Sequence, residues 1–214
     1  MPCVKAYRMT FPRISTSDYA MKANAIGSSL SAFTVCFFVK LKDPDTPSSA
    51  LTVYSYAASA SPSGNGIYVC LSSPNIAINI GTPKQIDEIK TNSKIEDDQW
   101  HHVCVTWENS KGEWQLYMDG QLKENGTGMM KDHHNPSGGT VVFGQDQDSV
   151  GGGFETGDAF GPGELTEVNL WGKVLSASDI SAQHANCTIT QASLVHWWDQ
   201  FKGGVHGEVQ VEEP

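Results

Sequence analysis

The chain has 214 residues, a formal net charge of −10 and a hydrophobic fraction of 39%. This length suits one large all-β domain or two small ones, and the negative charge argues against a nucleic-acid-binding surface while favouring a protein that holds cations. No apolar run approaches the roughly 20 residues of a membrane helix, so membrane insertion is not expected.

Strand signals dominate the chain. Short segments rich in β-branched and aromatic residues are bounded by Ser, Pro, Asp and Gly. Asp119-Gly120 supplies the positive φ angles that a two-residue hairpin turn needs. The expected strands are 33–39, 51–56, 66–71, 75–80, 102–107, 113–118, 121–123, 140–143 and 165–171.

One late segment has the signature of a helix. Ser176 and Asp179 form a capping box, residues 180–185 continue it, and Asn186 is the expected terminator. Short strands at regular spacing with one helix predict an all-β sandwich of two sheets. Because the sequence has no long linker and no internal repeat, residues 1–214 are expected to form a single domain.

The most informative stretch is the glycine-rich segment 143–158. It contains Asp146, Asp148, Glu155 and Asp158 but no Lys or Arg. Clustered carboxylates repel one another, and Ca²⁺, which takes six to eight oxygen ligands, would relieve that repulsion. Asp146 and Asp148 are two residues apart, so they share a face of an extended segment. The alternative is a solvated acidic loop.

The cysteines are Cys3, Cys36, Cys70, Cys104 and Cys187. No Cys-x-x-Cys spacing is present, so a zinc knuckle or a thioredoxin-type motif is not expected. Wide spacing suits long-range disulfides in a secreted protein, and the odd number leaves a thiol that is free or bridges to another chain. Asn125-Gly126-Thr127 is an N-glycosylation sequon at a hairpin end.

Tryptophans and histidines also invite functional interpretations. Trp107 and Trp114 lie on alternating strands and are expected in the core, not in a sugar-stacking platform. The pairs 101–102 and 133–134 are adjacent histidines, which point to opposite faces of a strand and cannot easily chelate one metal. His102 is expected to make a structural hydrogen bond beside Trp107.

The segment His102-Val-Cys-Val-Thr-Trp107 resembles the signature His-x-Cys-x-Ser/Thr-Trp of the pentraxin family. The family pattern continues with x-Ser/Thr, where this chain has Asn109. Residues 32–36, 53–57, 144–155 and 163–176 are also similar to pentraxin motifs, and the resemblance extends over about residues 6 to 210. The chain is therefore identified as resembling short pentraxins.

The resemblance implies a laminin-G-like, lectin-like antiparallel jelly-roll with one short helix. It implies a secreted, cyclic homo-oligomer of innate immunity and the acute phase. Such proteins bind phosphoethanolamine, phosphocholine or anionic saccharides through one or two Ca²⁺ ions per subunit. The face that carries the helix would meet complement-type effectors.

The family's metal ligands can be carried over by position. The implied ligands are Asn65, Asp146, Gln147 through its backbone carbonyl, Asp148, Glu155 and Asp158. Gly64 replaces an aspartate of the family pattern, which weakens the expectation of a second ion. The positions beside the ions that contact choline fall near Cys70 and Lys84, and a lysine there implies an anionic ligand without a choline requirement.

The resemblance also implies a disulfide pairing. The family's internal bridge would join Cys36 to Cys104, and some long pentraxins join the regions of Cys3 and Cys187. Cys70 would remain unpaired, either as a small buried residue or as a bridge to another chain.

Two other classes of protein remain as alternatives. A glycoside hydrolase needs a separated pair of carboxylates, whereas Asp146 and Asp148 are crowded by further acids, so catalysis is not expected. A pentraxin-like or laminin-G-like adhesion module of a larger receptor would use the same sandwich but would bind proteins.

Overall fold

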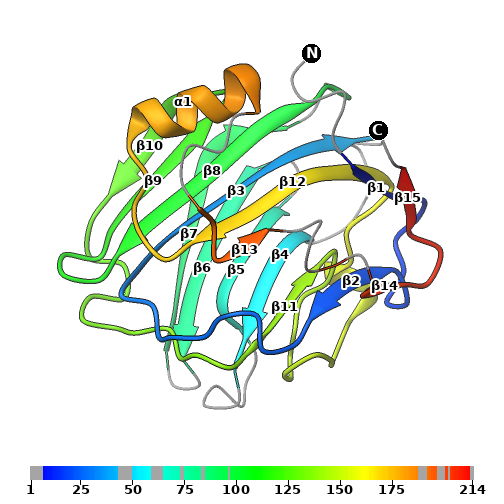
Figure 1. Cartoon of the computed structure of the whole chain (residues 1–214), viewed down its shortest axis with the longest axis horizontal. Helices are drawn as coiled ribbons and strands as arrows, with labels where there is room; N and C mark the ends of the chain where they lie inside the picture. The colour runs from blue at the N-terminus through cyan, green and yellow to red at the C-terminus, as the bar shows by residue number, and fades with distance from the viewer. Residues whose placement is uncertain are drawn as a thin grey trace.

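The computed structural model describes residues 7–42, 50–58, 65–72, 75–82, 85–95, 97–187, 192–196, 201 and 203–212. Within these residues, two antiparallel sheets pack face to face and one α-helix, α1 (Ala177–Asn186), lies outside them (Figure 1). The predicted fold class, an all-β two-sheet sandwich with one short helix, is therefore confirmed.

Sheet A carries the helix on its outer face. Its strand order is β10 (Gln121–Gly126), β9 (Glu113–Met118), β8 (His101–Glu108), β3 (Ala32–Leu41), β12 (Gly163–Trp171), β1 (Arg8–Phe11) and β15 (Gln210–Glu212), with β13 (Val195–His196) also paired to β12. Neighbours such as β8, β3 and β12 are distant in sequence, so the long crossovers of a jelly-roll connect them.

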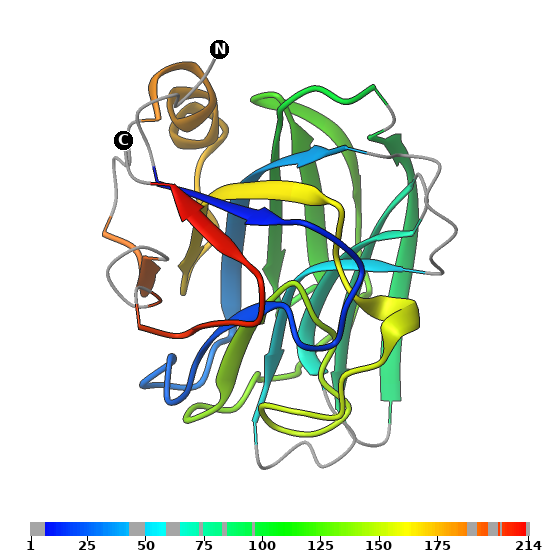
Figure 2. The same ribbon diagram turned by 90° about the vertical axis from the view of Figure 1, so that its right-hand side faces the viewer.

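Sheet B forms the second layer, and Figure 2 shows the two layers from the side. Its strand order is β14 (Val205–His206), β2 (Tyr19–Lys22), β11 (Thr140–Phe143), β4 (Leu51–Ala57), β5 (Asn65–Ser72), β6 (Asn75–Thr82) and β7 (Gln85–Lys94). A short 3₁₀ turn, η1 (Thr156–Asp158), lies between β11 and β12. In the described segments, no helix combines the length and the apolarity needed to cross a bilayer.

The core lies between the sheets because strands alternate their side chains between two faces. On β5, Ile67 and Val69 point inward into the core, whereas Tyr68 and Cys70 belong to the outer face of sheet B. Trp107 is completely buried in this core, as its strand position predicts, and its indole donates a hydrogen bond of 2.8 Å to the carbonyl of Met129.

Helix α1 begins and ends with side-chain and backbone caps. The hydroxyl of Ser176 accepts a 3.1 Å hydrogen bond from the Asp179 amide, which is the predicted N-cap. The predicted end is wrong by one residue, because Asn186 is still helical. Cys187 takes the left-handed conformation with φ of 53°, and its amide donates to the Gln183 carbonyl at 2.8 Å.

Beneath α1 lies a second, smaller apolar cluster. It consists of Cys36, Cys104, Tyr117, Trp171, Leu175 and Ile180. Cys36 and Cys104 form the disulfide that the resemblance implied, and they lie directly opposite each other on β3 and β8. The helix therefore covers the disulfide.

The two sheets are joined along one edge of the sandwich by Glu124. From edge strand β10, its carboxylate accepts hydrogen bonds from the backbone amides of Asn92 and Ser93 on β7, at 2.9 and 3.0 Å, and from the Ser93 hydroxyl at 2.7 Å. These contacts satisfy amides of an edge strand that could otherwise pair with another chain.

Replacing Glu124 with alanine is expected to lower the free energy of unfolding by about 1–3 kcal/mol, because three donors lose a charged acceptor. Denaturant titration measures the loss. Lys123→Ala is the control, since Lys123 is exposed and donates a 3.2 Å hydrogen bond to Gln121 on the same strand, and its removal should change the free energy by less than about 0.5 kcal/mol. Equal effects of the two substitutions would contradict the role of Glu124.

His101 is held between two carboxylates at the start of β8. Its Nδ1 lies 2.9 Å from Asp119 Oδ2 and its Nε2 lies 2.9 Å from Asp97 Oδ1. The hydrogen bond with Asp119, supported by that with Asp97, raises the pKa of His101 from 6.5 to about 9. The protonated imidazole is therefore the form that the folded protein favours.

This shift predicts a pH dependence of stability. Because the folded-state pKa lies above the unfolded one, the stabilisation is fully present below pH 6.5 and is lost as the pH rises to about 9. We expect wild type to exceed His101→Gln in unfolding free energy at pH 6, with the difference shrinking by pH 9.5. A difference that stayed constant over this range would show that folding does not raise the pKa of His101.

Candidate calcium site

The acidic loop is fixed to the outer face of sheet B by a buried glutamine. Gln147 is fully buried, and its side-chain amide donates to Ser55 Oγ at 3.0 Å and to the Thr140 carbonyl at 3.1 Å. Its side-chain oxygen accepts from the Gly151 amide at 2.8 Å. Because these bonds engage the side chain, the backbone carbonyl of Gln147 is the group left for a cation.

A second buried glutamine holds the beginning of the loop. Gln145 donates from its side-chain amide to the carbonyls of Ser15 at 2.7 Å and Asp18 at 2.9 Å. The Gln145 carbonyl accepts a 2.7 Å hydrogen bond from Ser55 Oγ. Ser55 on β4 therefore contacts both glutamines, and the loop leaves β11 in a defined direction.

Glycines then turn the loop back on itself. The backbones of Ser149 and Gly152 exchange hydrogen bonds of 3.2 and 2.9 Å, and Gly153 has a φ of 74°. A Cβ atom at Gly153 would lie 2.8 Å from the Cβ of Asp148, so only glycine fits this approach. Asp148 and Glu155 consequently lie on the two arms of one tight turn, and both are exposed.

Two further carboxylates of the loop are close enough to Cys70 to act on its pKa. Asp146 and Asp158 are half-buried, and Asp146 Oδ1 accepts from the Gln147 amide at 2.7 Å. Burial raises the pKa of the Cys70 thiol to about 12, and the nearby charges of Glu88, Asp146 and Asp158 add to this shift. The loop therefore brings Asp146 and Asp158 to the same region of sheet B.

The carboxylates do not form a closed cage. Among the described residues, no three acidic side chains bring their oxygens within 4.8 Å of one another. Asn65 begins β5, but its side chain lies outside the described part, as does all of Lys84.

The donor set nevertheless fits calcium. All the charged side chains of the loop are carboxylates, the hard oxygen ligands that Ca²⁺ prefers, and one backbone carbonyl is available beside them. The glutamines hold the backbone of the loop, while Asp148 and Glu155 are exposed and have room to turn toward an ion.

Three residues on the outer face of sheet B lie near the candidate calcium site and were not identified from the sequence. Tyr68 on β5, Asn79 on β6 and Glu88 on β7 are aligned across three neighbouring strands. The charge of Asp146 acts on the Tyr68 hydroxyl, and that of Glu88 acts on Cys70. Strand alternation assigns each residue to a face, but only the register between strands places them beside the loop.

Other predicted residues are located as follows. Cys70 is a buried free thiol, and Asn125 is exposed near the end of β10. Cys187 is disulfide-bonded, while its expected partner Cys3 lies outside the described residues. Lys90 on β7 lies 3.9 Å from Glu88, so this face also carries a cation.

His102 does not lie beside Trp107, contrary to the expectation from the sequence. The ring lies 4.5 Å from that of Phe38, and its Nε2 is 3.5 Å from Cys104 Sγ. The histidine beside Trp107 is His133, at a ring distance of 6.4 Å. The side chain of His102 leaves β8 on the face away from the core, because its neighbour Val103 points inward.

Comparison with known proteins places this geometry in a family. The model of the Pentaxin family matches residues 7–213. The native heptameric SAP-like pentraxin of Limulus polyphemus superposes with a TM-score of 0.76 at 22% identity, over 98% of this chain and 93% of that one. Domains LG4-5 of the mouse laminin α1 chain have a TM-score of 0.59 at 14% identity, over 81% of this chain and 44% of that one.

Curated relatives are longer proteins. Neuronal pentraxin-1 of Rattus norvegicus is 33% identical over 81% of this chain and 38% of its own length. Adhesion G protein-coupled receptor D2 of Homo sapiens is 43% identical over 48% of this chain and 10% of its own length. The chain thus spans well under half of these relatives. Because the family model covers nearly every residue, the chain belongs to the Pentaxin family.

Proposed function

We propose that this protein binds phosphate-bearing or anionic groups through calcium, without catalysing a reaction. The observation that carries the proposal is the acidic loop, which Gln145 and Gln147 hold against sheet B, with Asp146 and Asp158 both close enough to raise the pKa of Cys70. Phosphoethanolamine, phosphocholine and anionic saccharides are the ligand class.

In this proposal, the chain's residues hold one or two ions on a rigid sheet. Asp146, Asp148, Glu155 and Asp158 supply carboxylates, and Gln147 supplies its carbonyl, with Asn65 as a further ligand. When bound, calcium neutralises the loop and offers vacant coordination positions to an anion. Tyr68 is half-buried beside the loop and would limit the space available to the rest of the ligand, whereas Cys70 is buried beneath it.

The charge on the outer face of sheet B bears on the choice of ligand. Glu88 acts on Cys70 and so lies near the loop, where its carboxylate suits the ammonium group of phosphoethanolamine. Lys90, 3.9 Å away, partly offsets that charge. We therefore favour a phosphate ligand with a primary ammonium group over one that requires choline.

The family context supports a secreted protein that assembles into a cyclic homo-oligomer. The structural neighbour from Limulus is described as heptameric, and it covers nearly all of this chain. In such a ring, the face that carries α1 would be available to complement-type effectors, because the acidic loop lies on the outer face of the other sheet. Size exclusion with light scattering measures the number of subunits.

A second candidate is an adhesion module of a larger protein. Adhesion G protein-coupled receptor D2 and a sushi, von Willebrand factor type A, EGF and pentraxin domain-containing protein of Rattus norvegicus match this chain over 10% and 4% of their lengths. In that case the protein partner would replace the phosphate ligand. Calcium-dependent retention on phosphoethanolamine beads favours the lectin-like function, whereas an adhesion module should flow through.

Calorimetry of Asp148→Ala tests the site directly. Wild type should take up calcium and then bind phosphoethanolamine, while the variant should lose at least about tenfold in calcium affinity, worth about 1.4 kcal/mol. Asp148 is exposed, so the fold should persist, as circular dichroism would verify. Glu113→Ala on sheet A is the matched control. Unchanged calcium uptake by Asp148→Ala would overturn the assigned site.

A further inference from the structure

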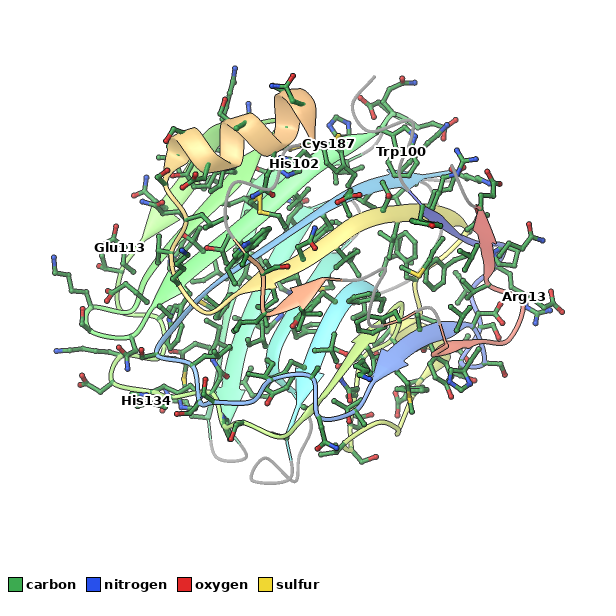
Figure 3. All side chains as sticks on the ribbon, viewed as in Figure 1. Arg13, Trp100, His102, Glu113, His134 and Cys187 are labelled. Carbon is green, nitrogen blue, oxygen red and sulfur yellow. A yellow bond between two sulfur atoms is a disulfide. The ribbon has the colours of Figure 1, made fainter. Side chains whose placement is uncertain are left out.

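A second set of donor atoms lies beneath α1 on the outer face of sheet A. The sulfurs of Cys36 and Cys104 and a ring nitrogen of His102 lie within 4.8 Å of one another, and all three residues are buried. Figure 3 shows His102 below the helix. Thiolate and imidazole are ligands of zinc, not of calcium. In the structure, the two sulfurs are bonded to each other and are not available as ligands.

The backbone holds these three side chains together independently of the bond between the sulfurs. Cys36 and Cys104 are paired across β3 and β8 with a Cα separation of 4.1 Å. His102 precedes Cys104 by two residues on β8, so both side chains leave the same face. Strands β12 and β9 flank this pair and continue the hydrogen-bonded sheet on both sides. A reduced protein would therefore keep the three donors adjacent.

One distance already matches a metal site. His102 Nε2 lies 3.5 Å from Cys104 Sγ. In a tetrahedral zinc site with Zn–N of about 2.0–2.1 Å and Zn–S of about 2.3 Å, the nitrogen and sulfur ligands are about 3.5 Å apart. His102 Nε2 and Cys104 Sγ are therefore already spaced like two ligands of one ion, whereas the Cys36 sulfur must rotate away from Cys104 Sγ after reduction to take a third position.

An unpartnered oxygen lies next to the same group. Asn169 on β12 is paired with Cys36 in the sheet, is 2% exposed, and its Oδ1 has no hydrogen-bond partner among the described residues. A buried acceptor without a donor is unfavourable. Asn169 also lines a small pocket with Phe38, Glu167, Gln183 and Cys187. A water molecule in the fourth coordination position would have this oxygen as an acceptor.

We propose that the reduced protein binds one Zn²⁺ through Cys36 Sγ, Cys104 Sγ and His102 Nε2, with a water that donates to Asn169. A tertiary phosphine supplies the two electrons that cleave the sulfur–sulfur bond. Its phosphorus is oxidised to the phosphine oxide, and one water provides the oxygen and the two thiol protons. Both protons are released when the thiolates bind the ion. The disulfide and the ion thus exclude each other.

The arrangement also limits the affinity. When Nε2 binds the ion, the proton of His102 resides on Nδ1, which has no partner among the described residues. Histidines that bind metals usually donate this proton to an acceptor, and losing such a partner weakens binding about 10- to 100-fold. We therefore expect weaker binding than in a dedicated structural zinc site.

Cobalt titration of the phosphine-reduced protein tests the proposal. We expect one Co²⁺ per chain, with a thiolate-to-cobalt absorption band that added Zn²⁺ removes. Cys36→Ser and Cys104→Ser should each abolish the band, while Cys70→Ser, a buried cysteine on the other sheet, should retain it. His102→Gln should weaken binding at least tenfold, whereas His101→Gln, whose ring is held by Asp97 and Asp119, should not.

Three results would overturn the proposal. They are the absence of the band in reduced wild type, its persistence in Cys36→Ser, and an equal band in the oxidised protein. If reduction partly unfolds the protein, the cobalt band still tests the proposal, because an ion that binds these three residues would also restore the fold. Circular dichroism of the reduced protein with and without Zn²⁺ measures that restoration.

Discussion

Replacing Gln147 with leucine is expected to lower the free energy of unfolding by about 3 kcal/mol and to weaken calcium binding at least tenfold. The substitution removes a side chain that is fully buried and makes three hydrogen bonds. The Thr140 carbonyl and the Gly151 amide then lose their partner, and each buried unsatisfied group costs about 1–3 kcal/mol. The loop that carries Asp146 and Asp148 would lose one of its attachments to sheet B, and the one at Gln145 would remain.

Denaturant titration with and without calcium measures both effects. Gln121→Leu is the matched control, because Gln121 is exposed on β10 and the same substitution there should change stability by less than about 0.5 kcal/mol. A Gln147→Leu variant that lost stability but kept its calcium affinity would separate the fold from the site. In that case, the calcium ligands would have to lie elsewhere.

The double substitution of Cys36 and Cys104 by alanine is expected to cost about 4 kcal/mol. The disulfide closes a loop with a sequence separation of 68, and the chain-entropy model assigns about that value to a loop of this length. The buried cluster under α1 would also lose two sulfur atoms that contact its aromatic and aliphatic members. Both effects act in the same direction.

Thermal and denaturant unfolding of the double variant provide the measurement. Cys70→Ala is the control, because Cys70 is an equally buried cysteine that forms no disulfide. Its loss should cost about 1 kcal/mol, the usual scale for a small cavity. A double variant that lost less than Cys70→Ala would mean that the disulfide contributes little to the folded state.

Most central strands could be predicted from the sequence, but several edge strands could not. The apolar alternation around Val35 and Val105 is strong because those strands are covered on their inner face. Strand β7 is largely polar because it lies at the edge of sheet B, where Gln85, Glu88 and Lys90 are exposed. Strands β1, β2, β14 and β15 are four residues or shorter and are defined by their partners more than by their own pattern.

The candidate site was predictable in part for a similar reason. The run of carboxylates without Lys or Arg is a local property, so Asp148 and Glu155 stand out in the sequence. The anchoring role of Gln147 depends on Ser55, which lies 92 residues away, and no local pattern reveals that contact. Glu88 is likewise recognised only after β5, β6 and β7 are placed side by side.

The aromatic core between the sheets has a consequence for communication across the molecule. Trp107, Phe143 and their neighbours are completely buried, and interiors packed in this way resist small displacements. A guest on the outer surface of sheet B would therefore leave the helix on the opposite side almost unmoved. In the proposed oligomer, the number of copies engaged at once would report occupancy to that side through avidity.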